Sequence, residues 1–130
     1  MGFAIPVLAG RWVQLEPLAE GLREGLRAAA DDERIWQFTL IVARGPEFDT
    51  WFDDALAQRD AGRLVPFAVR RLADEQLVGS TSFLEPNLRH RRIEIGSTWY
   101  SPKVWGAQVN AESKLLLLTH AFEALGMNRV

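Results

Sequence analysis

The residues best suited to chemistry lie in one short loop, residues 105–110, which joins an alternating segment to the longest helical pattern in the chain. The first N–H groups of a helix have no partner within it and lie at the positive end of its dipole, so they suit a phosphate group. Gly106 lets the backbone approach a ligand closely. A plain strand-to-helix turn is the alternative, because one glycine is a weak signal. The amides that would hold a pyrophosphate are those of Gly106, Ala107, Gln108, Val109, Asn110 and Ala111.

The elements that position this loop follow from the spacing of apolar residues. Alternation predicts strands over residues 11–16, 65–69, 77–83 and 93–100, with Pro86 and Asn87 breaking the pattern before the last of them. Helical spacing predicts a helix from Leu18 to Ala29 and another from Pro46 to Gly62. The final helix has Asn110 as its N-cap and Gly126 as its C-cap. Its apolar stripe consists of Ala111, Leu115, Leu118, Phe122 and Leu125.

Composition excludes several classes of protein. The chain has 130 residues, enough for one domain with a core, and 48% of them are hydrophobic. A net charge of −2 gives no electrostatic basis for binding nucleic acid. The longest purely apolar run, residues 115–118, is too short to cross a membrane. Without cysteine there is no disulfide or thiolate metal site, which fits a cytoplasmic protein, and neither histidine has a partner at a metal-ligand spacing.

Two stretches carry a resemblance to a known family. EIGSTWYSPKVWG and VNAESKLLLLTHAFEALGMNRV, with the order of elements, resemble the GNAT N-acetyltransferase superfamily, in particular its RimJ/RimL-like branch. The resemblance implies an α/β fold: a mixed, largely antiparallel sheet flanked by helices. It also implies that the strand before the loop contacts the pantetheine of acetyl-CoA and that the loop and helix hold the pyrophosphate. The pantetheine contacts would be the backbone amides of Thr98, Trp99 and Tyr100.

The resemblance further implies direct attack of a primary amine on the thioester of acetyl-CoA. Glu94 lies where some family members carry their base, with apolar Ile93 and Ile95 on either side of it in sequence. The alternative for Glu94 is an ion pair with Arg91, Arg92 or another surface cation. Trp36 and Trp51 lie in the region that forms the family's acceptor site, although tryptophans are more often core residues.

Three features of the sequence keep other functions open. The family loop follows Gln/Arg-x-x-Gly-x-Gly/Ala, but here Trp105, Gln108 and Asn110 take the three defined places. Gln108 therefore favours a non-catalytic acyl-CoA-binding or regulatory module as one alternative. The chain stops where the family's fifth strand would begin, so we expect residues 1–130 to be one incomplete domain, with the general acid beyond Val130. The second alternative is then a fragment that needs another chain, and we expect a homodimer or higher assembly through strand 91–100 or helix 111–125.

Overall fold

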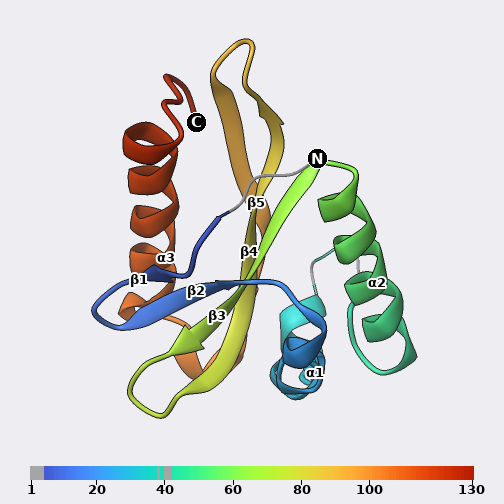
Figure 1. Cartoon of the computed structure of the whole chain (residues 1–130). Helices are drawn as coiled ribbons and strands as arrows, with labels where there is room; N and C mark the ends of the chain where they lie inside the picture. Colours follow the sequence, from blue (N-terminus) through green and yellow to red (C-terminus); the bar gives the residue numbers. More distant parts are fainter. Residues whose placement is uncertain (1–4, 38, 40–41) are drawn as a thin grey trace.

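One antiparallel sheet forms the centre of the molecule. The computed structural model describes residues 5–37, 39 and 42–130. Its five strands are ordered β1-β2-β3-β4-β5, and every neighbouring pair is antiparallel (Figure 1). A single parallel bridge joins Arg92 to Arg129, so the pairing is mixed but largely antiparallel, as expected. The strands are β1 (Leu8–Ala9), β2 (Val13–Pro17), β3 (Leu64–Arg71), β4 (Gln76–Asn87) and β5 (Arg92–Tyr100).

Helices cover both faces of this sheet. The helices α1 (Arg23–Ala30) and α2 (Pro46–Asp60) lie on one face, and α3 (Gln108–Thr119) lies on the other (Figure 1). Pro46 begins α2, where a missing N–H removes no helical hydrogen bond. Among the described residues, no helix is both long enough and apolar enough to cross a membrane. The remaining turns are η1 (Glu20–Leu22), η2 (Glu33–Trp36), η3 (Pro102–Val104) and the π-helical turn η4 (His120–Ala124) that continues α3.

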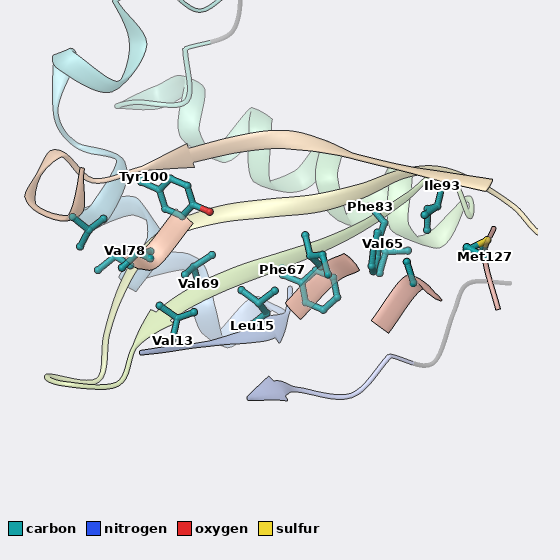
Figure 2. Close-up of a cluster of buried hydrophobic side chains, with 14 residues drawn as sticks. Val13, Leu15, Val65, Phe67, Val69, Val78, Phe83, Ile93, Tyr100 and Met127 are labelled. Carbon is teal, nitrogen blue, oxygen red and sulfur yellow. The ribbon is translucent and has the colours of Figure 1, made fainter. Parts of the chain in front are cut away.

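Two apolar clusters hold the layers together. The first lies between the sheet and α3, and Figure 2 shows its strand residues, among them Leu15, Phe67 and Phe83. The second lies between the sheet and the pair α1 and α2, and it is rich in aromatic rings. Arg23 and Arg27 of α1 both donate hydrogen bonds to Asp49 of α2, which fixes the two helices to each other. The sheet is therefore the central layer of the molecule, with a separate close-packed apolar cluster on each of its faces.

β5 contains a one-residue bulge near Ser97, and this bulge changes the face of the sheet on which the later side chains of the strand lie. Ser82 pairs with Gly96 and Ser80 pairs with Trp99, so β5 has one residue more than β4 in this interval. Ser97 itself has a φ of +49°, in the left-handed region. Ile93 and Tyr100, seven residues apart, consequently both pack on the α3 side, whereas an unbroken strand would place them on opposite faces.

The structure corrects three details of the final helix. It begins at Gln108 with Ala107 as its N-cap, so Asn110 is not the N-cap. Most of the predicted stripe faces away from the sheet: Leu115 and Phe122 are 61% and 47% exposed, whereas Leu125 packs against the first cluster. The inward face holds smaller side chains, which let the helix approach the sheet closely. That face consists of Val109, Ser113, Leu117 and Ala121. With leucine at all four positions from 115 to 118, apolar content alone does not identify the buried face.

The boundaries of the other elements differ from the prediction mainly in length. Pro86 and Asn87 do not break the third predicted strand, because β4 extends through both to Asn87. The first predicted helix starts later, since Ala19 is extended and η1 precedes α1. Gly62 and Gly126 have φ values of +77° and +68°, which fits their predicted places after helices.

Candidate functional site

The loop before α3 is shaped by its own hydrogen bonds. The Trp105 indole N–H donates to the Tyr100 carbonyl at 2.9 Å, and the Ala107 amide donates to the Val104 carbonyl at 3.2 Å. Gly106 has a φ of +79°, and no atom lies within 4 Å of the place a Cβ would occupy. The helix has no side-chain cap. The first amides of α3 therefore point into the loop region without a side-chain partner, while the Ala107 amide is already engaged.

A pocket of about 290 Å³ lies between the end of β5 and the start of α3. It brings together four of the residues predicted to bind cofactor: Thr98, Tyr100, Gly106 and Asn110. The others border it differently. The Val109 side chain is buried in the first cluster, whereas Ala107, Gln108 and Ala111 are exposed. The strand end, the loop and the helix thus converge on one concave surface, the arrangement that suits a phosphorylated ligand.

Trp99 and Tyr100 serve the core through their side chains. Trp99 is 6% exposed and packs between Trp36 and Trp51, at ring-centroid distances of 5.5 and 5.8 Å. Tyr100 is 9% exposed, and burial raises the pKa of its phenol. Neither the Trp99 Nε1 nor the Tyr100 hydroxyl has a hydrogen-bond partner among the described residues. Because both side chains are buried, a ligand along the edge of β5 would contact the backbone of Trp99 and Tyr100.

Lys114, on the second turn of α3, reaches the sheet beside this pocket. Its Nζ donates to the Thr98 hydroxyl at 2.8 Å and to the Thr81 hydroxyl at 3.4 Å, while the two hydroxyls lie 2.8 Å from each other. Burial lowers the pKa of the Lys114 ammonium. The lysine therefore links α3 to both β4 and β5 at the first residue beyond the bulge.

Glu94 lies near the start of β5, on the face opposite α3. Ile93 before it packs in the first cluster, so alternation turns the Glu94 side chain toward the layer of α1 and α2. The side chain is exposed and lines a groove of about 720 Å³ with Arg92 and Arg129. In the described part of the chain, Glu94 forms no ion pair with Arg91 or Arg92, the alternative its sequence neighbours suggested.

The two tryptophans predicted to line an acceptor site have different surroundings. Trp36 is 8% exposed, and its indole N–H donates to the Ala30 carbonyl, so it is a core residue. Trp51 is half-buried and lines a second pocket of about 230 Å³ between α2 and the sheet. That pocket extends to Ser97 at the bulge and to Leu84, the β4 residue that pairs with Glu94. Of the two, Trp51 is therefore the one next to β5's bulge and Glu94.

Two important residues of α3 were missed from the sequence. The Glu112 carboxylate accepts hydrogen bonds from the amides of Arg11, Trp12 and Val13 at 2.8, 2.6 and 2.8 Å. It fixes the beginning of α3 to the β1–β2 turn. Lys114 is the other. The sequence contained one signal that singled out Lys114: lysine is rare in this chain, with two lysines against thirteen arginines. The partners of both residues are distant in sequence, so spacing alone gave no indication of these contacts.

The two pockets next to the bulge of β5 differ in charge. The pocket at the start of α3 is lined by hydroxyl, amide, aromatic, aliphatic and backbone groups without a charged side chain. The pocket beside Trp51 also contains Asp54, Arg63 and Glu85. Within the described ranges, no group of three or more His, Cys, Asp or Glu side chains is arranged to hold a metal ion.

Comparisons with known proteins agree with the fold. A search among curated proteins finds no match. Among solved structures, a GCN5-related N-acetyltransferase from Brucella melitensis is 27% identical, with a TM-score of 0.81 over 93% of this chain and 56% of that one. A protein from T. thermophilus, provisionally assigned as an acetyltransferase, is 28% identical, with a TM-score of 0.77 over 98% of this chain and 65% of that one.

A third structure, RimL, a ribosomal L7/L12 alpha-N-protein acetyltransferase, is 14% identical and shows likeness of fold alone, with a TM-score of 0.75 over 92% of this chain and 66% of that one. The chain spans 56% and 65% of the length of the first two relatives. The family model described as an acetyltransferase (GNAT) domain matches residues 13–130. The chain therefore belongs to the GNAT acetyltransferase family.

Proposed function

We propose that this protein transfers an acetyl group from acetyl-CoA to a primary amine. The observation that carries the proposal is the pocket at the N-terminus of α3, where the end of β5, the Gly106 loop and the first helical turn meet. The pyrophosphate would bind the amides of Gln108, Val109 and Asn110, helped by the helix dipole. The pantetheine would run along the edge of β5 at residues 98–100, which has no strand beside it in the described part of the chain.

The chemical step needs a base for the acceptor ammonium and support for the developing oxyanion. We assign the base to Glu94. It lies four residues before Thr98, on the order of 13 Å along a strand, so the acceptor nitrogen would have to lie on the Glu94 side of the bulge, within reach of the carboxylate directly or through one water. The backbone amides of β5 at the bulge would steady the oxyanion, because the bulge leaves its extra residue outside the ladder.

The acceptor would enter from the side of α2. Trp51 and Ser97 line one pocket there, and Leu84 places that pocket next to Glu94. Acceptor and acetyl donor would then meet at β5 from opposite layers. Membership in the RimJ/RimL-like branch, with a protein N-terminus as acceptor, is part of this proposal, and a small-molecule amine is the other possibility. The absence of cysteine supports a cytoplasmic location.

The donor site is tested by Gly106→Val with Gly126→Val as its matched control. Both glycines have positive φ and open space where a side chain would go, so valine strains both positions similarly. Only Gly106 lies at the proposed site. We expect Gly106→Val to lower acetyl-CoA affinity about tenfold or more, equivalent to ~1.4 kcal/mol, in titration calorimetry. Gly126→Val should retain normal affinity. No binding by the parent chain at millimolar acetyl-CoA would refute the proposal for this chain.

A non-catalytic acyl-CoA-binding module is the second candidate, and Gln108 favours it because the family pattern has glycine there. Release of free CoA thiol separates the two candidates. Since the chain contains no cysteine, every thiol detected during the reaction comes from CoA. Thermal stabilisation by acetyl-CoA without thiol release, across a panel of amines, would favour the binding module.

We also propose that the chain assembles through β5 or α3. Two exposed features support this: the edge of β5 after Ile93, which pairs with no strand among the described residues, and the apolar surface of α3 that contains Leu115 and Leu118. An open strand edge and an exposed apolar stripe both favour association with another chain.

A further inference from the structure

Lys114 is a half-buried cation without a carboxylate partner. Its two hydrogen bonds go to the neutral hydroxyls of Thr81 and Thr98, and none of the salt bridges among the described residues includes it. Placing an ammonium in a partly buried site without an opposite charge is unfavourable. A methionine or leucine would fill the same space without that penalty. The position is therefore better suited to an anion that arrives from outside the chain.

The geometry limits where that anion can be. Two of the three ammonium N–H groups point to hydroxyls of β4 and β5, which leaves one for another acceptor. The closer hydroxyl belongs to Thr98, which also lines the pocket at the N-terminus of α3. Lys114 lies six residues beyond the start of α3, about 9 Å along the axis, so it is too far inward to be the main pyrophosphate partner. The Lys114 ammonium lies beside β5, farther from the start of α3 and closer to the bulge.

We propose that the Lys114 ammonium faces the sulfur of CoA and protonates the thiolate when it leaves. This inference rests on the proposed function, because it needs pantetheine beside Thr98. The acceptor nitrogen forms a bond to the acetyl carbon, the carbon–sulfur bond breaks, and its electron pair goes to sulfur. A proton then passes from Lys114 Nζ to sulfur, giving CoA thiol and a neutral lysine. The proton that the base removed from the acceptor returns through solvent to Lys114.

The surroundings of Lys114 suit this role. From the sheet, the groups that face it are the Thr81 and Thr98 hydroxyls, neither of which titrates in the working range. The titratable groups closest to it in sequence on α3 and β5 are Glu112, held by three amides of the β1–β2 turn, the buried phenol of Tyr100, two residues after Thr98, and His120, after the end of α3. Burial lowers the pKa of the Lys114 ammonium, which makes it a stronger proton donor than an exposed lysine.

The test uses CoA itself as the probe and needs no acceptor. The full chain lacks cysteine, so the S–H stretching band in a Raman spectrum reports the CoA thiol alone. Titration of that band with pH gives the pKa of the bound thiol, and calorimetry under the same conditions gives CoA affinity. The variants are Lys114→Met, Lys114→Arg and Thr98→Val. The control is Lys103→Met, because Lys103 is the other lysine, is exposed, and among the described residues donates its side-chain hydrogen bond to Gln76.

An ammonium near the sulfur should lower the pKa of the bound thiol by about 1 to 3 relative to free CoA. We expect this lowering in the parent chain and in Lys103→Met, its loss in Lys114→Met, and its retention in Lys114→Arg, which keeps a cation. Thr98→Val, which removes the closer hydroxyl, should show only part of the lowering of the thiol pKa. An unchanged thiol pKa in a Lys114→Met protein that binds CoA normally would overturn this inference and leave the donor site intact. Failure of the parent chain to bind CoA would instead overturn the proposed function, and this inference with it.

Discussion

At the scale of single residues, Glu112 stabilises the molecule more than its place on an exposed helical turn indicates. Its carboxylate accepts three backbone N–H groups from residues 11–13. We expect Glu112→Gln to lower the free energy of unfolding by roughly 1.5–3 kcal/mol, because an amide cannot accept all three donors as well as a carboxylate. Urea denaturation at neutral pH measures the loss. Glu123→Gln, at an exposed position near the end of the same helical segment, should change little.

The same residue predicts a dependence of stability on pH. Burial by itself would raise the pKa of Glu112, but the hydrogen bonds from the amides of Trp12, Arg11 and Val13 outweigh it, and the pKa lies below 4.5. Because the folded-state pKa is the lower one, the stabilising contribution is complete above the unfolded-state value and is lost as pH falls through the folded-state value. The stability difference between the parent chain and Glu112→Gln should therefore shrink below about pH 4.5. A difference that stays constant down to pH 2 would contradict this assignment.

Glu94 is the residue on which the catalytic proposal depends. If it is the base, Glu94→Gln should lower turnover ~10²–10⁴-fold and leave acetyl-CoA affinity near normal. The side chain is exposed and unpaired among the described residues, so the substitution should not reduce stability. Steady-state kinetics with any amine that the protein accepts, together with calorimetry, separates the two effects. Equal turnover in both proteins would assign the base to another group.

At the scale of elements, the close contact between β4 and β5 depends on Gly79. A Cβ built at this position would lie 2.3 Å from the Trp99 carbonyl oxygen, a backbone atom that cannot move alone. We expect Gly79→Ala to destabilise the protein by about 1–3 kcal/mol, as over-packing does elsewhere. Gly21→Ala is the matched control, since no atom lies within 4 Å of its Cβ position. Thermal unfolding of both variants measures the difference, and equal behaviour would show that β5 adjusts freely.

Pattern analysis predicted those elements whose local sequence and tertiary packing agree. Alternation located β2, β3, β4 and β5, and Pro46 with Gly62 marked the limits of α2, but the two-residue strand β1 was not predicted. The buried face of α3 could not be predicted, because consecutive leucines make every face apolar. Its start was misplaced because Ala107, with no capping side chain, is an N-cap that only the loop geometry defines. The bulge near Ser97 gave no signal either, since small polar residues around it fit a regular strand equally well.

The residues of the candidate site also differ in whether local sequence or tertiary packing defines their role. Residues proposed to contribute through backbone in a loop, such as Gly106, could be suggested from spacing and from family resemblance, and they stay a prediction. Residues that contribute through long-range side-chain contacts could not. Glu112 and Lys114 acquire their partners only when the sheet brings residues 11–13, 81 and 98 next to α3. A sequence without an alignment carries no record of such contacts.

At the scale of the whole molecule, the exposed apolar side of α3 and η4 predicts association. Leu118 and Phe122 are 37% and 47% exposed on this side. We expect the chain to form dimers or larger species in light scattering, and the double substitution Leu118→Glu with Phe122→Glu to shift it toward monomer with an unchanged circular-dichroism spectrum. Leu88→Glu is the control, because Leu88 is 58% exposed and belongs to the turn between β4 and β5, outside α3 and η4. A monomeric parent chain at high concentration would refute assembly through this surface.

The bulge lets β5 contain one residue more than β4 while the residues after it keep their faces. Substitutions at Ser97 change one exposed side chain. Deletion of Ser97 would restore regular alternation, with Thr98 and Tyr100 still on the α3 side and Trp99 still on the side of α2. A regular strand with all its residues retained would instead shift everything after Ser97 by one position, so that Trp99 would lie under α3 and the Lys114 ammonium would lose its hydroxyl partner on β5. In a mutational library this position should tolerate most amino acids and a one-residue deletion, so the bulge would be visible in gap patterns between relatives and not in residue identity.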